Sequence, residues 1–215
     1  MTMASPARPR SVMELVGDVV EKRVAELQRG YLDDQSAAVA ALAQLRRGAG
    51  KLPQDMPELW GVTGVELLFQ DQALPDREAS RAEAALFLAV TLYALHQQSR
   101  SDQRMHKAGI ELGEAVRRLM SGGDIDEPIR RRFVRVGAAT TPEVLAYRLR
   151  EIVSLLRREA IPLDYARLAR RLYQAQVPGG MQQVRQIWGR SFHAYRPQTS
   201  TTGTAGNGAT NDKDA

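Results

Sequence analysis

Four arginines lie within one short stretch of the sequence, DIDEPIRRRFVRV at residues 124–136. A guanidinium group stays charged at physiological pH, and its planar set of N–H donors matches the oxygens of phosphate and carboxylate groups. On a helix, Arg131, Arg132 and Arg135 fall within an arc of about 100°, with Arg130 apart from them. These side chains therefore form either a solvated helix face or a surface that meets a negatively charged partner.

The acids near these arginines do not balance all of them. Glu127 can pair with Arg131 at a spacing of four residues, and Asp126 can pair with Arg130 in the same way. No acid follows for Arg132 or Arg135 before Glu143. On the other side of the helix, three apolar residues fall within about 60° of one another and are expected to face the core. They are Ile129, Phe133 and Val136.

Other basic residues occur in small groups, which the reading below places at helix ends and in loops. Phosphates are evenly spaced along a nucleic acid and carry no sequence information, so a protein that tracks the backbone needs several such groups. Each group alone is weak evidence. The groups are Arg46 and Arg47 with Lys51, Arg100 with Arg104 and Lys107, Arg148 with Arg150, and Arg157 with Arg158.

The charge distribution supports a polyanion as a partner. The chain of 215 residues has a formal net charge of +5 and a pI of about 9.8. Residues 1–99 carry a net charge of −3, residues 100–171 one of +6 and residues 172–215 one of +2. Only four of the 30 basic residues are lysines. Codon bias also enriches arginine, so composition alone leaves both interpretations open.

The sequence shows no catalytic constellation. It has no cysteine, which excludes disulfides and thiolate zinc sites and favours a reducing intracellular compartment. The three histidines lack metal-binding spacing, and nucleotide-loop and nucleophile-elbow motifs are absent. Carboxylates at helix starts are better explained by capping than by a two-metal site. We expect no enzyme activity, no cofactor and no metal, although His106 could contact phosphate.

The hydrophobic pattern predicts an all-α fold, a helical bundle of about eight or nine helices in two packed sub-bundles. We expect a flexible N-terminus over residues 1–10, an N-terminal bundle over 11–122, a C-terminal bundle over 123–196 and a disordered tail over 197–215. The last helix, over about 181–195, should turn Trp188, Phe192 and Tyr195 inward, with base stacking a lesser possibility for the aromatic residues. Expected helix caps are Ser11 with Glu14, Asp33 or Asp34, Asp124 or Asp126, and Thr141.

A loop rich in glycine and proline is expected over residues 48–64, with Leu59 and Trp60 holding it against the core. The longest apolar run, residues 84–95, is 12 residues long, whereas a membrane span needs about 20. The first residues have no apolar core of a secretory signal. We therefore expect a cytoplasmic protein that does not enter the membrane.

The order of several short motifs resembles the CasB family, the small subunit of the type I-E CRISPR surveillance complex Cascade. The likeness covers about residues 12–195, and the motifs are specific only in combination. They are QLRR at 44–47, GxxLGxA at 109–115, RRFxRV at 131–136 and PLDYxxLAxxLY at 162–173, together with PELWGV at 57–62 and VRQIWGRSF at 184–192.

The resemblance implies an all-helical, non-enzymatic subunit that pairs as a homodimer beside the other Cascade subunits with their crRNA. It also implies a basic surface that stabilises the R-loop, in particular the single-stranded non-target DNA. The family's basic positions carry over onto Arg46, Arg47, Lys51, Lys107, Arg131, Arg132 and Arg135. The clusters described above add Arg104 and Arg148 to the predicted nucleic-acid-binding residues.

Two alternatives remain open at this point. In a helix-turn-helix regulator, the helix at 124–136 or at 141–159 would enter the major groove of DNA. That function needs base-reading Asn or Gln residues, and residues 141–159 contain neither. In a scaffold that binds only proteins, an exposed apolar stripe would replace nucleic-acid contacts.

Overall fold

The computed structural model describes residues 11–70, 73–120 and 124–196. These residues form eight α-helices and four short 3₁₀ helices, and they contain no β-strand. No helix among them combines the length and apolarity needed to cross a bilayer. The α-helices are α1 (Val12–Leu32), α2 (Ser36–Leu45), α3 (Asp76–Gln97), α4 (Leu112–Arg118), α5 (Glu127–Gly137), α6 (Pro142–Arg158), α7 (Tyr165–Ala175) and α8 (Gly180–Ala194); the 3₁₀ helices are η1 (Arg46–Gly48), η2 (Pro53–Asp55), η3 (Pro57–Leu59) and η4 (Val65–Phe69).

The all-α prediction is confirmed. The expected flexible N-terminus at 1–10 and the expected disordered tail at 197–215 lie outside the described residues.

Side-chain caps fix where several helices begin. Ser11 and Glu14 form the expected capping box at α1, Asp126 accepts from the N–H of Ile129 at 3.0 Å, and Thr141 caps α6. These three predictions are confirmed. The cap expected before α2 is wrong, because Gln35 occupies that position and makes no side-chain cap. Asp33 ends α1 and Asp34 takes a left-handed turn conformation, which aspartate tolerates better than most residues.

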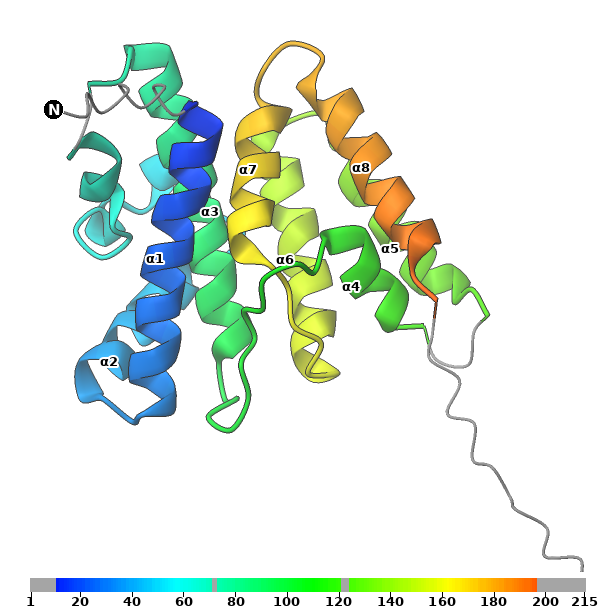
Figure 1. Cartoon of the computed structure of the whole chain (residues 1–215), viewed down its shortest axis with the longest axis horizontal. Helices are drawn as coiled ribbons and strands as arrows, with labels where there is room; N and C mark the ends of the chain where they lie inside the picture. The colour runs from blue at the N-terminus through cyan, green and yellow to red at the C-terminus, as the bar shows by residue number, and fades with distance from the viewer. Residues whose placement is uncertain (1–10, 71–72, 121–123, 197–215) are drawn as a thin grey trace, which may run out of the picture.

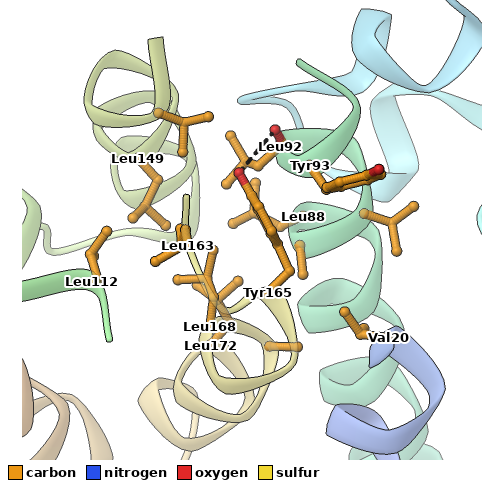
Figure 2. Packing of buried hydrophobic residues seen from close by; sticks show 14 of the residues in the cluster. Val20, Leu88, Leu92, Tyr93, Leu112, Leu149, Leu163, Tyr165, Leu168 and Leu172 are labelled. Carbon is orange, nitrogen blue, oxygen red and sulfur yellow. Dashed lines mark hydrogen bonds between the residues drawn. The ribbon is translucent and has the colours of Figure 1, made fainter. Parts of the chain in front are cut away.

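The core lies where α1, α3 and α7 run side by side, with α6 behind α7 (Figure 1). One continuous hydrophobic cluster joins residues from α1, α3, α6, α7 and α8. Tyr165 at the start of α7 is fully buried among leucines and points toward Leu92 of α3 (Figure 2). The cluster therefore includes residues from both of the predicted bundles, and the division near residue 122 stays a prediction.

The last helix is tied to a much earlier one by a very close approach. A Cβ on Gly113 of α4 would fall 2.0 Å from the main-chain oxygen of Trp188 in α8. Only glycine leaves room for backbones at this distance. Trp188 and Phe192, expected to face the core, are buried on this side of α8, whereas Tyr195 is only partly buried. Beside them, α5 packs on both α6 and α8.

A polar group is enclosed in the middle of the core. The Nδ1 atom of His96 lies 2.8 Å from the hydroxyl of Tyr165. Burial lowers the pKa of His96 from 6.5 to about 3, so the imidazole is neutral. The same hydroxyl lies 3.4 Å from the main-chain oxygen of Leu92, to which it can donate (Figure 2).

The loop before η4 is held by only part of the expected anchor. Leu59 and Met56 are buried against Phe87 of α3 in a small cluster of their own. Trp60 is 58% exposed, so the expectation that it packs into the core is wrong. Its indole N–H donates to the oxygen of Pro53 at 3.3 Å. Adjacent residues in η3 and the turn after it point in different directions, so Leu59 is buried while Trp60 is exposed.

Candidate nucleic-acid interface

The arginines of α5 divide into paired and unpaired groups. Glu127 pairs with Arg130 at 2.7 Å and with Arg131 at 3.2 Å. Hydrogen bonds from Arg130 and then Arg131 lower the pKa of Glu127 to about 2. The expected pair between Asp126 and Arg130 is not formed, because Asp126 caps the helix instead. One carboxylate therefore serves two guanidinium groups at the start of the helix.

The rest of this helix face keeps its charge uncompensated. Arg132 and Arg135 are exposed, and neither has an ion pair or side-chain hydrogen bond among the described residues. On the opposite side, Val136 is buried while Ile129 and Phe133 are partly buried, as the periodicity predicts. We call the outward surface of Arg131, Arg132 and Arg135 the α5 face. Of its three cations, Arg132 and Arg135 are available to an anion from outside the chain, whereas Arg131 is paired with Glu127.

A second basic surface forms where η1 and the turn after it meet α6. Gly50 has φ +81°, and a Cβ there would fall 2.9 Å from Cδ of Arg150. Lys51, next to Gly50, is exposed and contacts the sulfur of Met56 at 3.4 Å. Arg47 has only a long ion pair of 3.7 Å to Glu58. We call this surface the loop cluster; it consists of Arg46, Arg47, Lys51 and Arg150.

Arg150 is a functional candidate missing from the predicted set. Its guanidinium is exposed and has no acidic partner among the described residues. The predicted residue Arg148 is only 29% exposed, pairs with Glu151 at 2.9 Å and stacks over Tyr147. Residues two apart on a helix point about 200° apart, so only one of the two arginines can face the loop. The signal that distinguishes them is the glycine at residue 50, which the sequence alone does not connect to α6.

The predicted residues Arg104 and Lys107 lie together. Both line a hollow of about 630 Å³ between α1 and the loop that follows α3. Both are exposed, and no acid pairs with either among the described residues. Glu21 also lines this hollow, so the surface carries mixed charge.

Hydrogen bonds hold the loop that carries these two residues in place. His106 lies 3.1 Å from Glu21 through Nε2, and its Nδ1 accepts from the N–H of Tyr165 at 3.2 Å. Asp164 accepts from the N–H of Gly109 at 2.7 Å. The imidazole is only 6% exposed, and the possible phosphate contact of His106 finds no support in its position. Its role is to fasten the loop to α1 and α7.

Two arginines from different basic groups, Arg100 and Arg157, have structural roles. Arg100 donates to the main-chain oxygens of Arg157 and Arg158 at 2.7–3.2 Å. These carbonyls lie at the C-terminal end of α6, where the guanidinium supplies further donors and meets the negative end of the helix dipole. Arg157 in turn donates to Gln98. Arg100 and Arg157 are therefore committed within the fold.

The remaining basic surfaces are distributed along the molecule. Figure 1 places α2, which leads into the loop cluster, at one end and α5 toward the other. A small-molecule pocket gathers its ligands around one point, whereas these cations are spread over several elements. Such spacing is suited to an extended polyanion.

Comparisons with known proteins agree with this architecture. Residues 41–193 match the family model for the CRISPR-associated protein Cse2. The crystal structure of CasB from Thermobifida fusca is similar, with 55% sequence identity and a TM-score of 0.77, over 84% of this chain and 98% of that one. A Cse2-family CRISPR-associated protein from Thermus thermophilus has 26% identity and a TM-score of 0.61, over 82% and 98%.

No curated protein matched the chain in a sequence comparison. The family model nevertheless spans well over half of the sequence, and the CasB structure is similar over most of its length. On this evidence, the chain belongs to the CasB/Cse2 family of CRISPR-associated proteins, whose members are structural subunits of Cascade.

Proposed function

We propose that this non-catalytic subunit uses its basic surfaces to hold the nucleic-acid backbone and stabilise the R-loop, chiefly through the displaced non-target strand. The observation that carries the proposal is the set of exposed cations without acidic partners among the described residues. Arg132 and Arg135 on the α5 face and Arg46 and Arg150 in the loop cluster belong to this set. A helix face that contacts only water does not require all of these cations to lack acidic partners.

The energetics of an R-loop make such contacts effective. A guide–target heteroduplex is about as stable as the DNA duplex that it replaces, so backbone contacts from protein can shift the balance. The displaced strand offers phosphates at regular intervals and needs charge rather than base-specific readout. Arginines on helix faces supply that charge at several points along one strand.

The proposed partners follow from the family. We infer that the chain assembles with the other Cascade subunits and their crRNA and that it pairs as a homodimer inside the complex. Two copies would double the number of basic surfaces along the displaced strand. The α5 face of each copy would then bind a different part of the same strand.

The test removes the charge of the α5 face. The triple variant Arg131→Ala, Arg132→Ala, Arg135→Ala should weaken binding to random single-stranded DNA similarly for all sequences. If about five phosphates are neutralised, log K falls with log salt at a slope of about −3.5. Because Arg131 is already paired with Glu127, the variant removes two unpaired cations and should bring the slope to about −2.1. Fluorescence anisotropy at salt concentrations between about 50 and 300 mM measures both the affinity and the salt slope.

A matched control removes the same charge from arginines that already have acidic partners. The triple variant Arg158→Ala, Arg167→Ala, Arg170→Ala breaks pairs to Glu159, Asp164 and Asp18 and should change the slope little. Equal effects of the two triples would contradict the proposal, because net charge alone would then explain binding. A loss confined to one duplex sequence would instead favour a helix-turn-helix regulator.

A further inference from the structure

A small hollow lies between α3 and the loop that precedes η4. Its volume is about 310 Å³. That volume accepts one long side chain and is too small for a folded element. The lining residues are Pro53, Trp60, Thr63, Val65, Glu83 and Phe87.

The wall made by Trp60 is exposed but fixed. Its side chain is 58% exposed, the largest fraction among the large hydrophobic side chains of the described residues. The hydrogen bond to Pro53 sets the orientation of the indole, and the buried neighbour Leu59 anchors the turn on Phe87. An indole held in this way presents the aromatic surface that binds cations best.

A carboxylate completes the hollow. Glu83 on α3 is partly buried, and no described residue pairs with it or donates a hydrogen bond to its side chain. An ionised carboxylate without a partner can accept charge-assisted hydrogen bonds from a cation placed beside it. Trp60 and Glu83 therefore favour the same kind of guest from two sides of the hollow.

The surrounding charge favours a cation and disfavours a nucleic acid. Residues 52–70 carry Asp55, Glu58 and Glu66 and contain no lysine or arginine, although the whole chain has a net charge of +5. In the structure, Glu58 pairs with Arg47 at 3.7 Å, and Arg23 of α1 donates to the main-chain oxygen of Val62. Asp55, Glu66 and Glu83 keep their charge without an ion pair among the described residues.

We propose that this hollow binds an arginine or lysine side chain presented by a neighbouring protein subunit. The cationic group lies against the Trp60 indole and pairs with Glu83, and its methylene stem contacts Val65 and Phe87. A single buried anchor of this kind contributes much of the affinity in many interfaces. The inference depends on the proposed function only for the identity of the neighbour, a subunit of Cascade.

A probe titration tests the hollow without any complex. The full chain, labelled with ¹⁵N in tryptophan, gives two indole signals, one from exposed Trp60 and one from buried Trp188. Nα-acetyl-arginine amide should shift the Trp60 signal and leave that of Trp188 in place. Nα-acetyl-citrulline amide has nearly the same shape without the charge, and it should shift Trp60 much less.

Variants separate the hollow from general charge. Glu83→Gln should weaken the arginine probe about fivefold or more, whereas Glu66→Gln, which removes an exposed acid outside the lining, should leave it within about twofold. Equal shifts with arginine and citrulline, or no shift at Trp60, overturn the proposal. A larger shift with oligo-dT than with the arginine probe also overturns it, because the hollow would then bind nucleic acid.

A second measurement uses the assembled complex. Cascade that lacks its small subunit is titrated with wild-type chain, with Trp60→Ala and with Glu83→Gln. Each variant should bind about fivefold or more weakly while its affinity for oligo-dT stays within about twofold. Unchanged retention of both variants contradicts the proposal. If wild-type chain itself fails to bind, the proposed function fails, and the probe titration still decides the hollow.

Discussion

Arg150 lies across Gly50, with its Cδ atom 2.9 Å from the point where a Cβ on residue 50 would fall. This contact brings the turn after η1 against α6 and places Arg150 beside Lys51. The backbone of Gly50 has φ +81°, a conformation that residues other than glycine adopt only at an energetic cost. Both the conformation and the close approach therefore require glycine here.

Replacing this glycine should disrupt the loop cluster. Gly50→Ala adds a strained left-handed residue and a contact with Arg150, and it should lower the free energy of unfolding by about 1–3 kcal/mol. Chemical denaturation measures this change. Gly61→Ala is the control, because a Cβ at residue 61 meets nothing within 4 Å. Equal stability of the two variants would show that the turn adjusts freely.

Arg150 should contribute to nucleic-acid binding although its neighbour Arg148 contributes less. Arg150→Ala removes an exposed cation without an acidic partner among the described residues, and it should make the salt slope for single-stranded DNA about 0.7 less negative. Arg148→Ala removes a cation that is already paired with Glu151, so it should change the slope less. A larger effect of Arg148→Ala on the slope would reverse this assignment.

Local sequence signals were sufficient for much of the fold. The 3.6-residue apolar period and caps such as Ser11 and Thr141 act within one or two turns, so they can be recognised without tertiary information. The cap before α2 was mispredicted because two adjacent aspartates could serve equally well as a cap or as a turn. The structure uses them in the turn that ends α1.

The candidate site was harder to predict, for a physical reason. Whether an arginine is free depends on what lies across the fold. Arg100 sits in a polar loop by sequence, yet it caps the end of α6, 57 residues away in sequence. Trp60 next to buried Leu59 is exposed, because adjacent side chains point in different directions and only Leu59 joins the small cluster on Phe87. Such contacts join distant segments, and no local pattern encodes them.

Neutralising Glu127 should strengthen nucleic-acid binding. In Glu127→Gln, Arg130 and Arg131 lose their shared carboxylate and become free for phosphates. The affinity for single-stranded DNA should rise, and the salt slope should become more negative by up to about 1.4. Glu26→Gln, which releases Arg23 on α1, is the control for a change of one charge. A weaker affinity in Glu127→Gln would show that Glu127 positions these arginines for binding.

The protein should lose stability in mild acid because of His96. The pKa of His96 is about 3 in the folded chain and returns to its ordinary value near 6.5 on unfolding. Between these values the unfolded chain binds more protons, so stability falls as the pH is lowered from 6.5 toward 3. The slope from this group reaches about 1.4 kcal/mol per pH unit.

Urea denaturation at several pH values between about 4.5 and 7 measures the slope. Most of this range lies between the folded and unfolded pKa values of His96. His96→Gln should be less stable at neutral pH, because its contact with Tyr165 changes, and should lose about one proton of the acid dependence. His193→Gln is the control at an exposed histidine and should retain the wild-type slope. An unchanged slope in His96→Gln would assign the dependence to other groups.

The close approach of Gly113 to Trp188 has a consequence for biosynthesis. While a ribosome makes the chain, α4 emerges before its packing partner α8, which lies about 70 residues further along the sequence. The apolar face of α1 waits still longer for α7. Nascent chains must therefore keep these surfaces uncovered until translation is nearly complete, and truncated products that end before α7 would be substrates for chaperones and proteases.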